Sequence, residues 1–114
     1  MRRVVVSTNT IPFDIKAICY AHDAINDCLE RGEAPLPTSA LLLDDMDERD
    51  TAEIITSLDV AEAWLNCADA LVVFVDQGVP ANMRFYIEMA RRWAMEVEFR
   101  SLPQWATDKK CLPA

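Results

Sequence analysis

The stretch that decides the fold is residues 69–90, which read DALVVFVDQGVPANMRFYIEMA. Its apolar run, 70–75, ends at Asp76, a short loop follows, and a helical pattern begins near Asn82. A continuous apolar run of this length is typical of a strand that is covered on both faces of a parallel sheet. Because open α/β sheets bind ligands at the carboxyl ends of their strands, this stretch also predicts a ligand-binding edge.

Strand and helix patterns alternate on both sides of this stretch. The run Val4–Val6 is β-branched and suits a covered strand, and Gly32 suits a helix C-terminus. This alternation predicts an α/β fold of the Rossmann/flavodoxin-like type, a three-layer sandwich whose mostly parallel sheet has roughly four to five strands. The expected strands are 3–7, 34–37 (a strand or an extended segment), 70–75 and, at an edge, 96–100, and the expected helices are 12–32, 51–66 and 82–94. We assign residues 1–102 to one domain and expect 103–114 to be an irregular tail.

Composition restricts the partners. The chain of 114 residues has a formal net charge of −8 and a pI of about 4.5, and its basic residues cluster only in pairs. We therefore expect no nucleic-acid partner, because phosphate-backbone binders need clustered Lys and Arg. No window of about 18 apolar residues occurs, so we expect no membrane span. The N-terminal apolar run is too short for a signal peptide and is interpreted as the first strand.

The four cysteines, Cys19, Cys28, Cys67 and Cys111, form no C-x-x-C pair, and His22 is the only histidine. This pattern argues against a structural zinc site, and we expect no metal and no cofactor. Cys19 and Cys67 fall on apolar-looking helix faces, which predicts buried free thiols and a reducing, cytoplasmic location.

The first helix carries apolar residues at near-helical period. We expect this stripe to be its buried face, with His22 as a core or interface residue rather than a catalytic one. The members of the stripe are Ile15, Ile18, Cys19, Ile25 and Leu29.

The carboxyl edge of the predicted sheet collects polar residues that could hold a ligand. Ser7, Thr8 and Asn9 follow the first strand and could contact a sugar or a phosphate, although a capped loop would use the same residues. Asp76 could bind ribose hydroxyl groups. Asn82 and Met83 could present backbone N–H groups to an anion at the helix N-terminus.

Several segments together resemble a small branch of the nucleoside 2-deoxyribosyltransferase-like superfamily that occurs in phages and bacteria. The acidic loop and the last helix are the most specific of them, and the resemblance spans roughly residues 3–102. The matching segments are VVVSTN (4–9), GEAPLP (32–37, similar to G-x-x-P-x-x-P/S-H), LDDMDER (43–49, similar to L-D-D-x-D-x-x-x-R), ADALVVF (68–74) with NMRFYIEMA (82–90, similar to G-M-R-x-x-I-E-x-A), and VEFR (97–100, similar to V-E-Y-R).

The resemblance implies a Rossmann-like domain that binds a nucleoside or nucleotide and forms a homo-oligomer, a dimer or larger. In the transferases a carboxylate attacks the anomeric carbon, and a second base then captures the sugar. The Glu that does this lies in a G-x-x-x-E pattern, which Asn82 and Tyr86 occupy here. Tyr86 is a poor glycosyl acceptor, and Glu88 lies about 200° further round the helix. The resemblance therefore implies ligand binding by Tyr86 rather than catalysis.

Three functions remain open at this stage. The first is nucleoside or nucleotide binding at the sheet edge. The second is an N-glycosidase or deoxyribosyltransferase that uses a relocated carboxylate, for which Asp45, Asp59 and Asp76 are candidates. The third is a non-enzymatic adaptor or inhibitor that acts through its acidic surface. The acidic loop 44–50 could bind Mg²⁺ or Ca²⁺, but it lacks the Gly of a calcium loop and reads better as a solvated loop.

Overall fold

The computed structural model of the protein describes residues 1–9, 14–38 and 51–106, with only the backbone described for 51–57. Its elements alternate between strand and helix in the predicted order. They are β1 (Arg2–Ser7), α1 (Ile15–Glu30), β2 (Glu33–Pro37), α2 (Thr51–Cys67), β3 (Ala70–Phe74), α3 (Ala81–Arg92), β4 (Glu96–Arg100) and α4 (Pro103–Ala106). The acidic loop 44–50, for which a solvated loop was predicted, lies outside the described residues.

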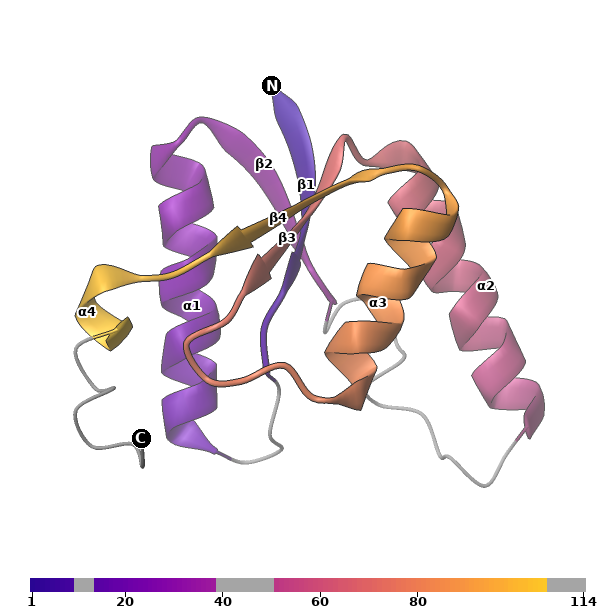
Figure 1. The fold of residues 1–114 in the computed structure, drawn as a ribbon, viewed down its shortest axis with the longest axis horizontal. Coiled ribbons are helices and arrows are strands. Elements are labelled where there is room, and N and C mark those ends of the chain that lie inside the picture. The colour runs from indigo at the N-terminus through magenta and orange to yellow at the C-terminus, as the bar shows by residue number, and fades with distance from the viewer. Residues whose placement is uncertain (10–13, 39–50, 107–114) are drawn as a thin grey trace.

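The four strands form one parallel sheet in the order β2-β1-β3-β4. β1 and β3 are the central strands, with Val4 paired with Ala70 and Ser7 with Val73. Figure 1 shows α1 and α4 on one side of the sheet and α2 and α3 on the other. The predicted Rossmann/flavodoxin-like α/β sandwich is therefore confirmed, with β4 at the edge where it was expected.

Alternation along β1 divides the core between the two faces of the sheet. Val4 and Val6 pack with residues of α1, whereas Val5 packs with residues of α2 and α3. Successive side chains of a strand point to opposite faces, so a continuous apolar strand such as β3 serves both layers. All five residues of β3 are fully buried.

The termini of α1 follow from its sequence, but its predicted buried face is wrong. Asp14 caps the N-terminus by accepting hydrogen bonds from Lys16 N and Ala17 N, and Gly32 follows the C-terminus with φ +77°. The stripe that was expected to be buried is mostly exposed, with Ile15 at 77%, Ile18 at 61% and Leu29 at 55%. The residues that pack on the sheet are Ala17, Tyr20, Ala24 and Cys28.

The thiol positions correct a second expectation. Cys19 and Cys67 are exposed, and Cys28 is the buried thiol. All three are free. His22 is also exposed, so it is not a core residue. Within the described ranges, no helix combines the length and the apolar character needed to cross a membrane.

The start of the tail is ordered, whereas an irregular segment was expected. Pro103–Ala106 forms the short helix α4, and its Trp105 packs edge-on against Tyr20 at 5.2 Å between ring centroids. The Trp105 indole N–H also donates to Asp23 at 2.8 Å. These contacts attach the residues after β4 to α1.

Candidate functional site

The candidate site lies where β1 and β3 end side by side. The helix that follows β1 covers one face of the sheet and the helix that follows β3 covers the other (Figure 1), so the direction of the chain connections reverses between these two strands. Such a topological switch point is where open α/β sheets bind their ligands.

Three hydroxyl-bearing residues are buried at this edge. Ser7 ends β1 and is 0% exposed, and Thr8 and Thr38 are 5% and 3% exposed. Within the described part of the chain, the Ser7 Oγ has no hydrogen-bond partner. Ser7 lies two residues after Val5, so its side chain faces the α2 and α3 side of the sheet. A buried hydroxyl without a partner is unfavourable, and a bound ligand would supply the missing hydrogen bond.

Asn9 connects the two loops. Its side-chain amide donates to the carbonyl oxygen of Gln77 at 2.8 Å, across the gap between the ends of β1 and β3. Gly78 follows with φ +87°, a conformation that non-glycine residues rarely adopt. This hydrogen bond joins Asn9, just after β1, to the loop that follows β3.

Asp76 is brought to the same edge, but its carboxylate is engaged with the α1 side of the molecule. One oxygen accepts from the Tyr20 hydroxyl at 2.7 Å and from Leu102 N at 2.8 Å, and the other accepts from the Ser101 hydroxyl. Burial, together with the hydrogen bond to Asp76, raises the pKa of Tyr20 well above its usual value. This arrangement joins β3, α1 and the segment after β4, and a ligand would have to displace one of these donors.

Helix α3 begins at Ala81, one residue before the start near Asn82 that the sequence predicts. Pro80 is the N-cap residue and provides no side-chain hydrogen bond, and Asn82 lies within the first turn. The first helical bond runs from Arg84 N to Pro80 O at 3.0 Å, and Asn82 Oδ1 accepts from Met83 N at 3.0 Å. Met83 is buried at 1% exposure. Asn82 therefore does not cap α3, and it does not have a positive φ, which among the described non-glycine residues occurs only at Ala94.

Tyr86, which occupies the position of the family nucleophile, is 1% exposed and packs between α3 and the sheet. Its ring makes an edge-to-face contact with Phe85, with centroids 6.2 Å apart. It belongs to the cluster that includes Val5 and Val73, on the side of the sheet that Ser7 faces. Tyr86 therefore lies beneath the candidate edge rather than at the surface.

The other candidate carboxylate among the described residues, Asp59, is not at this edge. Asp59 is exposed on α2, about 200° round the helix from the buried Ala61, so it points away from the sheet. Asp45 lies outside the described residues. Of the two proposed nucleophiles that the structure describes, Asp76 lies at the strand ends and Asp59 does not.

Residues 5–100 match the model of a family described as a domain of unknown function, DUF7768. The chain belongs to this family. No curated protein matches the sequence. The matched residues include the whole candidate edge, from Ser7 to Tyr86.

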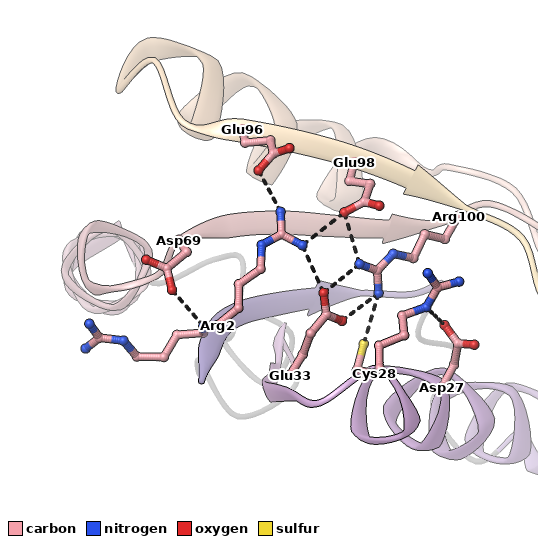
Figure 2. A network of polar contacts seen from close by, with 10 residues as sticks. Arg2, Asp27, Cys28, Glu33, Asp69, Glu96, Glu98 and Arg100 are labelled. Carbon is pink, nitrogen blue, oxygen red and sulfur yellow. Dashed lines mark hydrogen bonds and ion pairs between the residues drawn. The ribbon is translucent and has the colours of Figure 1, made fainter.

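The DUF7768 domain also contains a charged cluster that the sequence did not reveal. Figure 2 shows Arg100 and Glu33 facing each other across the sheet, with Arg2 and Glu98 beside them. Arg100 Nη1 and Nη2 donate to the two carboxylate oxygens of Glu33, both at 2.7 Å, and Nη2 also donates to Glu98 at 3.0 Å. Arg2 completes the cluster by bonding to Glu33 at 2.9 Å and to Glu96 at 2.6 Å. The one sequence signal is that Glu96, Glu98 and Arg100 alternate along β4 and so share a face.

The centre of the cluster, Arg100 and Glu33, is buried beside Cys28 of α1, whereas Arg2, Glu96 and Glu98 are partly exposed. The side chains of Arg100 and Glu33 are 5% and 7% exposed. The hydrogen bonds from Arg100, and then those from Arg2, lower the pKa of Glu33 to about 2. Burial raises the pKa of the adjacent Cys28 thiol to about 11, so this thiol is protonated near neutral pH. The cluster has the character of a structural ion network rather than of a reactive site.

Proposed function

We propose that the protein binds a nucleoside or nucleotide at the carboxyl ends of β1 and β3. The observation that carries the proposal is the Ser7 hydroxyl, which is fully buried at the switch point and has no partner among the described residues. The resemblance to the nucleoside 2-deoxyribosyltransferase-like superfamily supports the same edge, as does the general location of ligands in such sheets.

The chemistry of the edge favours a polar ligand of low charge. Residues 7–9, 38 and 77–83 supply hydroxyl, amide and backbone groups, and none of them is charged. Such groups suit the hydroxyls of a sugar and the edge of a base. The N-terminus of α3 could receive a single phosphate through its backbone N–H groups. A nucleoside or nucleoside monophosphate fits these groups better than a triphosphate, whose charge would oppose the net charge of −8.

The proposal is for binding without glycosyl transfer. Transfer needs a carboxylate at the anomeric carbon, and the position that the resemblance assigns to this carboxylate is occupied by the buried Tyr86. The oxygens of Asp76 already accept three hydrogen bonds, and Asp59 points to solvent. We therefore expect no release of base from deoxynucleosides. Base release that is abolished by Asp45→Asn would instead establish a glycosidase or transferase activity.

The direct test is thermal unfolding and calorimetry with a panel of nucleosides, nucleoside monophosphates and ADP-ribose. A ligand at about 100 times its Kd stabilises the folded state by about 2.7 kcal/mol, which raises the Tm of a domain of this size by about 10 °C. Ser7→Ala should weaken binding about tenfold, because one hydrogen bond to the ligand is lost. It should not destabilise the free protein, in which this hydroxyl has no described partner.

Ser101→Ala is the matched control. It removes the same group near the same edge, but the Ser101 hydroxyl bonds to Asp76 on the α1 side. It should leave ligand affinity unchanged. The proposal is rejected if no member of the panel raises the Tm, or if the two variants bind a ligand equally well.

We also propose a cytoplasmic location. The support is that Cys19, Cys28 and Cys67 are all free, two of them at the surface, which suits a reducing compartment.

A further inference from the structure

The outward face of α1 is apolar and has no covering element among the described residues. Ile15, Ile18 and Leu29 are 77%, 61% and 55% exposed, and Ile25 is only partly buried by the core beside it. Singly exposed apolar residues are ordinary, but a continuous stripe on one helix face marks an interaction surface. Together with His22, these residues form what we call the α1 stripe.

The α1 stripe has the spacing of a helix-pairing seam. Its residues follow one another at intervals of three, four, three and four positions, from Ile15 through Ile18, His22 and Ile25 to Leu29. This is the a/d repeat by which two helices pack along their length. The repeat is also symmetric about His22, since Ile18 and Ile25 lie four and three positions from it and Ile15 and Leu29 lie seven positions on either side.

The distribution of charge indicates which partner can bind the α1 stripe. The molecule carries a net charge of −8, so two copies repel one another over most of their surfaces. At 100° per residue, the α1 stripe occupies a sector of about 80° on the helix, and this sector contains no Asp, Glu, Lys or Arg. Depletion of charged residues is the compositional mark of an interface core. A second copy of this chain can therefore approach here without bringing like charges together.

We propose that the protein forms a two-fold symmetric homodimer in which the α1 stripes of two copies pack antiparallel, with the two His22 side chains at the axis. Ile18 then faces Ile25 of the other copy, and Ile15 faces Leu29. The antiparallel arrangement also opposes the dipoles of the two helices. This inference is independent of the proposed ligand site, which lies at the ends of β1 and β3.

The size of the surface predicts a weak dimer. At 1.5 Å per residue, the 16-residue α1 is about 24 Å long, and a helix face is about 10 Å wide. A stable interface buries about 800 Å² on each partner, which is more than one helix face of this size supplies. The polar His22 at the centre weakens the seam further while fixing its register. The dimer should therefore dissociate on dilution, in the micromolar range typical of small interfaces.

Sedimentation velocity over a range of protein concentrations tests whether the α1 stripe is a dimer interface. The wild-type protein should shift from monomer to dimer as concentration rises, and Ile18→Glu should remain monomeric. His22→Leu should tighten the dimer at least tenfold, an effect that a merely structural histidine would not produce. Trp64→Glu is the control, because Trp64 is 52% exposed on α2, at a separate apolar groove between β2 and α2.

A wild-type protein that stays monomeric at about 0.5 mM, well above the micromolar range, would overturn the proposal. So would a dimer that survives Ile18→Glu, or one that Trp64→Glu dissociates.

A cross-linking experiment tests the antiparallel arrangement of the two α1 helices. The native cysteines are replaced by Ser or Ala, one new cysteine is introduced, and the protein is oxidised. The replaced residues are Cys19, Cys28, Cys67 and Cys111. His22→Cys should form a disulfide-linked dimer, because the antiparallel axis brings this position against itself. Ile15→Cys should not, because its two copies would lie about 21 Å apart along the helices. Cross-linking through position 15 would refute the antiparallel arrangement.

Discussion

Replacing Glu33 by Gln tests whether the buried charged cluster stabilises the fold. The substitution keeps the size of the side chain and removes the charge that the guanidinium of Arg100 faces at 2.7 Å. One carboxylate oxygen becomes an N–H₂ group, which points donor hydrogens at the donors of Arg100. Because both side chains are at most 7% exposed, water cannot replace the lost interaction.

Two independent arguments give the same size for the loss of unfolding free energy in Glu33→Gln. Removing one partner of a buried ion pair typically costs 3–5 kcal/mol, and Glu98 at 3.0 Å keeps part of the compensation for Arg100. Separately, the pKa of Glu33 falls from 4.5 to about 2, and a shift of this size corresponds to about 3 kcal/mol of stability. We therefore expect Glu33→Gln to lower the free energy of unfolding by about 3 kcal/mol at pH 7.

The pH dependence of the unfolding free energy distinguishes loss of the Glu33 charge from simple misfolding of the variant. The pKa of Glu33 is lowered in the folded state, so its contribution is fully present above pH 4.5 and is lost as the pH falls toward about 2. At pH 4 the wild-type protein should already have lost about 1 kcal/mol of this contribution. The difference between the wild-type protein and Glu33→Gln should shrink accordingly, while the carboxylates outside the cluster titrate equally in both.

Urea unfolding followed by circular dichroism at pH 7 and pH 4 measures both quantities. Glu88→Gln is the control, since its pair with Arg91 is 3.4 Å long and both side chains are more than half exposed. This variant should change stability by less than about 0.5 kcal/mol. If Glu33→Gln were equally mild, or if its deficit were the same at both pH values, the buried cluster would not be a stabilising element.

Three further substitutions follow from the backbone and the edge. Ala94→Gly should raise stability by about 1 kcal/mol in thermal unfolding, because Ala94 is exposed and holds φ +54° after α3. Gly32→Ala should lower stability by about 1 kcal/mol in the same assay, purely through its φ of +77°, since an added Cβ would meet no atom within 4 Å. Tyr20→Phe should cost about 2 kcal/mol in urea unfolding, because Asp76 loses a donor to its carboxylate and an acceptor for its N–H. A change of the opposite sign in any of these would contradict the stated cause.

The fold could be predicted because its central strands carry an unambiguous signal. The runs Val4–Val6 and 70–74 are continuous and apolar, and only a sheet covered on both faces buries such residues completely. The helix boundaries follow from local chemistry, as with Asp14 at the start of α1 and Gly32 after its end. Local signals of this kind need no knowledge of distant contacts.

The buried face of α1 could not be predicted from hydropathy, because the helix has two apolar faces. The face that packs on the sheet uses the small residues Ala17 and Ala24, which allow close approach, together with Tyr20. The opposite face has the larger Ile15 and Ile18, and a hydropathy scale ranks these higher. Size complementarity with the sheet, rather than hydropathy, decides which face is inside.

The roles of the polar residues depended on partners far away in the chain. Asp76 looked like a ligand group at a strand end, and its partner Tyr20 lies 56 positions earlier. Arg100 closes a strand that reads as an exposed edge, and its partner Glu33 is 67 positions away. The position of Ser7 at the sheet edge was predictable, whereas its lack of a partner emerged only from the packed structure.

The bond between Arg100 and Glu33 has a consequence for how the sheet opens. Backbone hydrogen bonds connect only neighbouring strands, but this pair joins β4 to β2, the two outermost strands of the sheet. Neither outer strand can peel away without separating the buried charges. Local fraying of β2 is therefore coupled to fraying of β4. The amide hydrogens of these two strands should exchange with solvent through a shared opening rather than independently.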